Sequence, residues 1–160
     1  METMMFGNDN DGVTVLKTLT DTLADSINGY RDAAEHVDSN EFRQMFVQLA
    51  EDRSRTLSDL QAEVSRLGGS VDSDGTTLGH LHQRWLDFKA GLTGRDDKAV
   101  INEVERGEDY LKGKFEAALS SDSLDANVRS PIERAYGSVR EGHDRVSQLK
   151  HSLEGHPTNI

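Results

Sequence analysis

Apolar residues recur every three or four positions along four long stretches of this chain, and this spacing limits the possible folds more than any other feature. Such spacing aligns apolar side chains on one face of an α-helix and predicts that this face is buried. The first series runs through Leu16, Leu19, Leu23, Ile27, Tyr30, Ala34 and Val37. Strand-like alternation and internal repeats are absent from the sequence. An all-α domain is therefore predicted.

Turn and cap residues indicate where the first three helices meet their connections. Residues 38–40, with the sequence Asp-Ser-Asn, supply turn and N-cap chemistry before a second helix that ends at Gly68-Gly69. Asp96 and Asp97 can cap a third helix, and they suit the positive end of its dipole. The apolar face of this third helix extends over residues 100–119.

The start of the fourth helix is ambiguous in the sequence. Its apolar series runs from Leu124 to Leu153, but Pro131 lies inside this series. Residues 130–133, Ser-Pro-Ile-Glu, also read as a capping box with proline at the first helical position. The helix therefore begins either near Leu124, with a kink at the proline, or at Pro131.

The connection between the second and third helices is predicted to be a long crossover. The first two helices are joined by a few residues and should lie antiparallel. The second helix is about 40 Å long at 1.5 Å per residue, and residues 68–97 are numerous enough to run back along it. The second and third helices would then be parallel. The crossover contains a short amphipathic segment with Leu78, Leu81, Trp85 and Phe88.

Charge and composition exclude several classes of function. The 160 residues include 18 Lys and Arg against 29 Asp and Glu, so the formal net charge is −11. This sign disfavours nucleic acid and anionic lipid as partners. The absence of cysteine excludes disulfides and thiolate zinc sites. A basic, apolar leader and a membrane-length apolar run are also absent, so we expect a cytoplasmic protein without a membrane partner.

Several motifs resemble those of a bacterial family of ferritin-like four-helix-bundle proteins of unknown function. The motifs are Asn28–Glu35 (NGYRDAAE), Leu67–Gly69 (LGG), Gly79–Trp85 (GHLHQRW) and Glu105–Asp109 (ERGED). The resemblance extends over nearly the whole chain and implies a ferritin-like bundle with the long crossover, but it implies no activity. We expect the bundle to span residues 13–154, with flexible tails at residues 1–12 and 155–160.

The sequence lacks the complete ligand set of a ferritin-type di-iron centre. Such a centre takes a Glu from each of two helices and a Glu-x-x-His motif from each of the other two. The second helix has no histidine, and Arg53 lies at the middle of its apolar face. His143 is preceded three positions earlier by Arg140 rather than by glutamate. Glu35 lies on the flank of the first helix, roughly 120° from the centre of its apolar face.

Four polar residues are instead predicted to lie toward the core: Tyr30, Arg53, Glu108 and His143. An unpaired buried arginine would be very costly, so we infer that Arg53 pairs with Glu108, in the bidentate geometry that guanidinium favours. Gly107 lies on the third apolar face and would leave room for close packing or for the arginine. The cluster is either a satisfied network that fixes helix register, or an ion pair that occupies a vestigial metal site or binds a small anion.

Two functional classes remain open at this point. The first is a non-enzymatic bundle that acts in stress, by self-association or through an unidentified protein partner, and we favour this class because the ligand set is incomplete. The alternative is a metalloprotein that binds iron, manganese or zinc through a non-standard set: Glu35, Glu105, Glu108 and His143. No nucleophile elbow and no phosphate-binding glycine loop occur in the sequence, so no catalytic residue is predicted.

Overall fold

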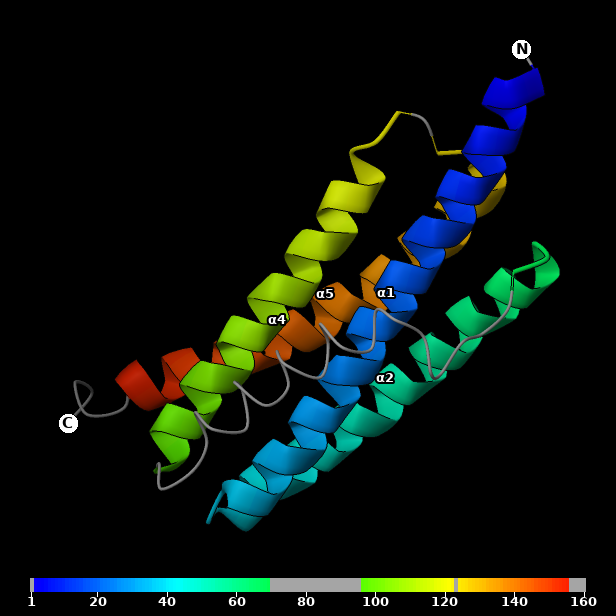
Figure 1. Ribbon diagram of the computed structural model, residues 1–160. Coiled ribbons are helices and arrows are strands. Elements are labelled where there is room, and N and C mark those ends of the chain that lie inside the picture. The colour runs from blue at the N-terminus through cyan, green and yellow to red at the C-terminus, as the bar shows by residue number, and fades with distance from the viewer. Residues whose placement is uncertain (1, 70–95, 123, 156–160) are drawn as a thin grey trace.

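The computed structural model describes residues 2–69, 96–122 and 124–155, and describes side chains over residues 12–69, 96–122 and 124–153. Four long helices form this part of the chain (Figure 1): α1 (Glu2–His36), α2 (Asn40–Arg66), α4 (Asp97–Leu119) and α5 (Ala126–Gly155). The predicted all-α fold is confirmed. None of the described helices combines the length and the apolar character needed to cross a membrane.

The helices form a bundle in which each packs mainly on two neighbours. α1 packs on α2 and α4, and α5 packs on α4 and α2. Figure 1 shows that α2 and α4 run in the same direction, while α1 and α5 run in the opposite direction. The predicted parallel arrangement of the second and third long helices is therefore confirmed. The expected short helix with Leu78, Leu81, Trp85 and Phe88 falls outside the described residues.

α2 and α4 begin where the sequence predicts, and each is preceded by a side-chain N-cap. Ser39 is the N-cap of α2 and accepts a hydrogen bond from the backbone N–H of Phe42. Asp96 caps α4 in the same way, by accepting from the N–H of Ala99. Asp97 instead accepts hydrogen bonds from two backbone N–H groups in the turn between α1 and α2, at 2.8 and 3.0 Å. This contact fixes the start of α4 against the α1–α2 turn.

The N-terminal boundary of the bundle differs from the expectation. α1 begins at Glu2 and so extends through the segment where a flexible tail was expected over residues 1–12; the flexibility of this segment stays a prediction. Gly12 is buried and packs closely on α5: an added Cβ would be 2.8 Å from Val128 Cγ2. At the other end, α5 ends at Gly155, and residues 156–160 fall outside the described residues.

The structure also resolves the start of the fourth long helix. α5 begins at Ala126 and contains Pro131, so the start near Leu124 is correct and the start at Pro131 is wrong. The backbone carbonyl of Asp125 accepts hydrogen bonds from the N–H groups of Val128 and Arg129, at 3.0 and 2.8 Å. This first turn forms before the proline, which is buried within the helix.

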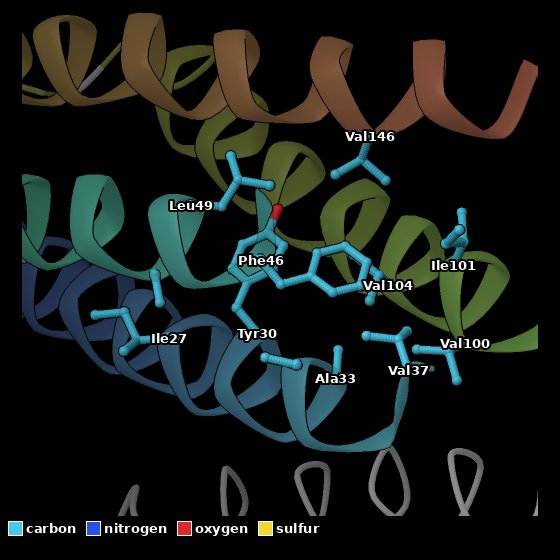
Figure 2. Packing of buried hydrophobic residues seen from close by; sticks show 12 residues of the cluster. Ile27, Tyr30, Ala33, Val37, Phe46, Leu49, Val100, Ile101, Val104 and Val146 are labelled. Carbon is cyan, nitrogen blue, oxygen red and sulfur yellow. The ribbon is translucent and has the colours of Figure 1, made fainter. Parts of the chain in front are cut away.

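The apolar core consists of two clusters at the two ends of the bundle. The first is shown in Figure 2 and includes Tyr30, Phe46, Leu49, Val104 and Val146. The second includes Leu23, Leu60, Leu111, Phe115 and Val139. On α2 and α4, the segments between the two clusters contain Arg53 and Glu108, which are both buried. A polar pair therefore lies between two apolar layers.

Candidate functional site: a buried ion pair between α2 and α4

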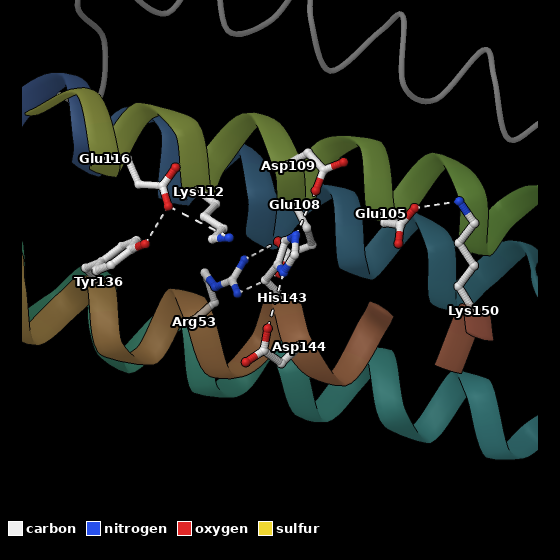
Figure 3. Close-up of polar contacts among 10 residues, drawn as sticks. All are labelled: Arg53, Glu105, Glu108, Asp109, Lys112, Glu116, Tyr136, His143, Asp144 and Lys150. Carbon is white, nitrogen blue, oxygen red and sulfur yellow. Dashed lines mark hydrogen bonds and ion pairs between the residues drawn. The ribbon is translucent and has the colours of Figure 1, made fainter. Parts of the chain in front are cut away.

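Arg53 and Glu108 form a bidentate ion pair in the middle of the bundle. Arg53 Nη1 donates to Glu108 Oε2 at 2.6 Å, and Nη2 donates to Oε1 at 2.9 Å (Figure 3). Each side chain is only 2% exposed. Ser26 on α1 accepts a further hydrogen bond from Nη1 at 2.8 Å. The predicted pairing and its two-bond geometry are confirmed.

The apolar spacing of α2 and α4 brings this pair into the core. Arg53 lies four residues after the buried Leu49, on the same face of α2. Glu108 lies between Val104 and Leu111 on the buried face of α4. Removing two charges from water is costly, and two short charge-assisted hydrogen bonds are the contacts that offset this cost. Each charge therefore requires the other for its burial.

The electrostatics of the pair keep the arginine charged. Burial opposes the charged guanidinium, but the charge and hydrogen bonds of Glu108, together with Tyr30, outweigh this effect, and the pKa of Arg53 is raised above its usual value. The guanidinium carbon also lies 5.4 Å from the ring centroid of Tyr30, within the range of a cation–π contact.

Tyr30 contributes its ring to this site, while its hydroxyl remains unsatisfied. The side chain is 2% exposed, and among the described residues the hydroxyl has no hydrogen-bond partner of acceptable geometry. The ring packs against Phe46, with centroids 6.0 Å apart. Burial and the negative charge of Glu108 raise the pKa of Tyr30 well above its usual value. The Tyr30 hydroxyl therefore stays protonated and uncharged in the folded bundle near neutral pH.

His143 lies at the edge of the site and has partners of its own. Nε2 of His143 donates to Asp109 Oδ1 at 2.7 Å, which joins α5 to α4 (Figure 3). Its other ring nitrogen, Nδ1, is 3.5 Å from Asp144 Oδ1, a distance typical of a weak contact. Within the described residues, His143 makes no hydrogen bond or ion pair with Arg53 or Glu108, so it borders the pair without joining it.

The alternative metal-binding set does not converge in the structure. Glu108 binds Arg53, and Glu105 accepts a hydrogen bond from Lys150 on α5 at 2.7 Å. Glu35 is exposed on α1. Across the described side chains, no three His, Asp or Glu residues are grouped so that they could hold a metal ion. The residues present do not fit a di-metal centre of the ferritin type, because the central carboxylate is already neutralised by a cation.

Sequence reasoning missed two residues that shape the site. Gly142 on α5 packs against the guanidinium: an added Cβ would clash with Arg53 Nη2 and lie 3.5 Å from Glu108 Oε1. The role of making room for the arginine was expected at Gly107. A glycine inside a helix is itself a signal, because it lowers helix stability without a turn to explain it. Ser26 also had a signal, since it precedes Tyr30 by four residues on the same helix face.

Comparisons with known proteins agree with the fold. A family model described as a domain of unknown function (DUF2383) matches residues 11–121, a range that includes Arg53 and Glu108 but ends before α5. No protein with a curated description is detectably similar.

A solved structure of similar fold belongs to a two-domain protein from Anabaena variabilis that contains DJ-1/ThiJ/PfpI-like and ferritin-like domains. The TM-score is 0.74 at 17% sequence identity, over 91% of this chain and 40% of that chain. The chain thus spans less than half of that protein, and the likeness supports the ferritin-like bundle predicted from the motifs. Because the family model matches residues 11–121, this chain belongs to the DUF2383 family of domains of unknown function.

Proposed function

We propose that this chain is a non-enzymatic ferritin-like bundle in which a guanidinium–carboxylate pair occupies the position of a di-metal site. The observation that carries the proposal is the pair of hydrogen bonds from Arg53 to Glu108, made by two side chains that are each 2% exposed. A bundle with this core would act as a folded scaffold, through its surface, rather than as a metal-dependent catalyst.

The chemistry of the pair supports this proposal in two ways. A permanent positive charge within the core repels a divalent cation, and both oxygens of Glu108 already accept hydrogen bonds. A metal ion would first have to displace the arginine, which would leave a buried guanidinium without a partner. Breaking a buried pair in this way costs about 3–5 kcal/mol. Metal binding would have to exceed this cost before any net affinity appeared.

The surface-based role is self-association or binding of a protein partner in the cytoplasm. The formal net charge of −11 supports a partner other than nucleic acid or anionic lipid. Light scattering coupled to size-exclusion chromatography tests the first mode. A discrete oligomer whose mass does not change on dilution supports self-association, whereas a monomer at all concentrations rejects it.

Elemental analysis tests the absence of a metal centre. The protein is purified without chelator, and iron, manganese and zinc are measured per chain, together with the Glu108→Ala and His143→Ala variants. We expect metal contents far below one per chain, equal in all three proteins. Stoichiometric metal that disappears in either variant would overturn the proposal in favour of a metalloprotein.

A further inference from the structure

The exposed side of α2 carries less charge than the exposed side of α5. From residue 44 to residue 65 of α2, nine residues are exposed and three of them are charged. From residue 133 to residue 144 of α5, six residues are exposed and five of them are charged. A solvated helix face typically carries charged residues, whereas the centre of a protein interface is depleted of them. The exposed side of α2 is therefore a candidate interaction surface.

The middle of this side is a continuous face, which we call the α2 outer face. At about 100° per residue, it consists of the exposed residues within about 60° of the direction of Glu51: Gln44, Val47, Gln48, Glu51, Arg55, Ser58, Ala62 and Ser65. Val47 is 44% exposed and is the one large apolar side chain that is exposed among the described residues. The short side chains from Ser58 onward leave room for a second helix to approach closely.

The two charged residues of the α2 outer face lie about one turn apart at its middle. Glu51 is exposed and has no hydrogen-bond or ion-pair partner among the described residues. Arg55 is 70% exposed and pairs with Asp52 on the same helix through Nη2. A guanidinium has five N–H donors, so this contact leaves donors of Arg55 for a further carboxylate. An unpaired acid and an incompletely used guanidinium therefore lie together on a face with no other charge.

We propose that the α2 outer face binds the same face of a second copy of this chain, with the two α2 helices antiparallel. This inference rests on the proposed self-association and identifies its surface. In a twofold dimer, if one residue contacts another across the interface, the reverse contact also forms. A twofold axis midway between residues 51 and 55 makes Glu51 of each copy face Arg55 of the other. The interface then contains two equivalent ion pairs.

Other arrangements of two α2 helices do not match these charges. A parallel pair in register would place Glu51 against Glu51 and Arg55 against Arg55, and like charges in contact repel. An antiparallel pair shifted by one heptad would leave Glu51 opposite Gln48 or opposite Ala62, according to the direction of the shift. Of these arrangements, the antiparallel pair centred between residues 51 and 55 alone satisfies both charges in both copies.

Reversing either charge should disrupt the dimer. Glu51→Arg would bring two guanidinium groups together at each of the two contacts, and Arg55→Glu would bring two carboxylates together. An exposed ion pair contributes up to about fivefold in affinity, and the dimer contains two, so either reversal should weaken dimerisation by about 25-fold. Glu133→Arg on α5 is the matched control, because Glu133 is also exposed and unpaired among the described residues.

Mixing the two variants tests the contact between Glu51 and Arg55 directly. The Glu51→Arg chain has two guanidinium groups at the contact and the Arg55→Glu chain has two carboxylates, so an equimolar mixture should form a heterodimer. Sedimentation equilibrium over a range of concentrations measures the dissociation constants, and circular dichroism verifies folding. We expect equal dimerisation of the unmodified and control chains, weakened dimerisation of each single variant, and restored affinity in the mixture.

The outcomes separate this surface from self-association in general. An unmodified chain that is monomeric at all concentrations would overturn both the surface and the self-association on which it rests. A dimer that neither reversal weakens, or a mixture whose affinity is not restored, would overturn the α2 surface alone and leave self-association intact.

Discussion

Replacing both partners of the buried ion pair should harm the bundle less than replacing either one alone. Arg53→Met would leave the Glu108 carboxylate buried without either of its two hydrogen bonds. Glu108→Leu would leave the guanidinium with Ser26 as its remaining hydrogen-bond acceptor among the described residues. Removing one member of a buried pair costs about 3–5 kcal/mol, because the other charge stays buried without compensation.

The size of the coupling follows from these values. If the two sites were independent, the single losses would add to about 6–10 kcal/mol, which is comparable with the whole stability of an ordinary domain. The double variant contains no buried charge and keeps approximately the original volume. Such replacements range from neutral to stabilising in other proteins. We therefore expect the double variant to be more stable than either single variant, with a coupling free energy of at least about 3 kcal/mol.

Urea unfolding followed by far-ultraviolet circular dichroism measures the four free energies of this cycle. If a single variant does not fold, Glu108→Gln provides a milder change, because its side-chain carbonyl can still accept from Arg53. Additive losses within about 0.5 kcal/mol would mean that the two residues do not interact. That result would refute the assignment of the pair as the polar centre of the core.

Three further predictions concern the residues around the pair. Gly142→Ala should destabilise the bundle by about 1–3 kcal/mol in urea unfolding, because the new methyl group displaces the guanidinium of Arg53. Gly137→Ala in the same helix has open space and should stabilise by about 0.5–1 kcal/mol; a loss equal to that of Gly142→Ala would contradict this contact. Tyr30→Phe should change stability near neutral pH by less than about 1 kcal/mol, because the hydroxyl lacks a hydrogen-bond partner among the described residues; a loss above 2 kcal/mol would reveal a bond. Because the pKa of Tyr30 is raised in the folded bundle, the unfolded chain loses the phenol proton near pH 10 while the folded chain keeps it. The free energy of unfolding should therefore fall above pH 10, and it should fall less steeply in Tyr30→Phe.

The helices and their order were predictable because they depend on local spacing and cap chemistry. The apolar series from Leu16 to Val37 required only helical periodicity, and Ser39 and Asp96 required only N-cap preference. The early start of α1 was not predictable in this way. The close packing of Gly12 on Val128 was not predictable either, because these residues are far apart in sequence. At Pro131, two local signals conflicted, and a turn formed ahead of the proline decided the outcome.

Part of the candidate site was predictable because a buried charge requires a partner of opposite charge. Arg53 at the centre of an apolar face had to find an acid, and Glu108 was the acid closest to the centre of the third apolar face. The positions of Ser26 and Gly142 depend on how α1 and α5 approach the pair, and one sequence does not specify this approach. His143 was expected in the cluster, but its bond to Asp109 holds it at the edge. Helical periodicity can place a residue at the edge of an apolar face, but it does not determine which neighbouring side chain that residue contacts.

A crystal structure of the protein soaked with Fe²⁺ or Mn²⁺, with anomalous scattering measured at the metal edge, tests the central claim most directly. We predict an intact Arg53–Glu108 pair with both hydrogen bonds and no anomalous peak between α2 and α4. An arginine side chain turned out to solvent, with a metal ion bound by Glu108 in its place, would contradict the account.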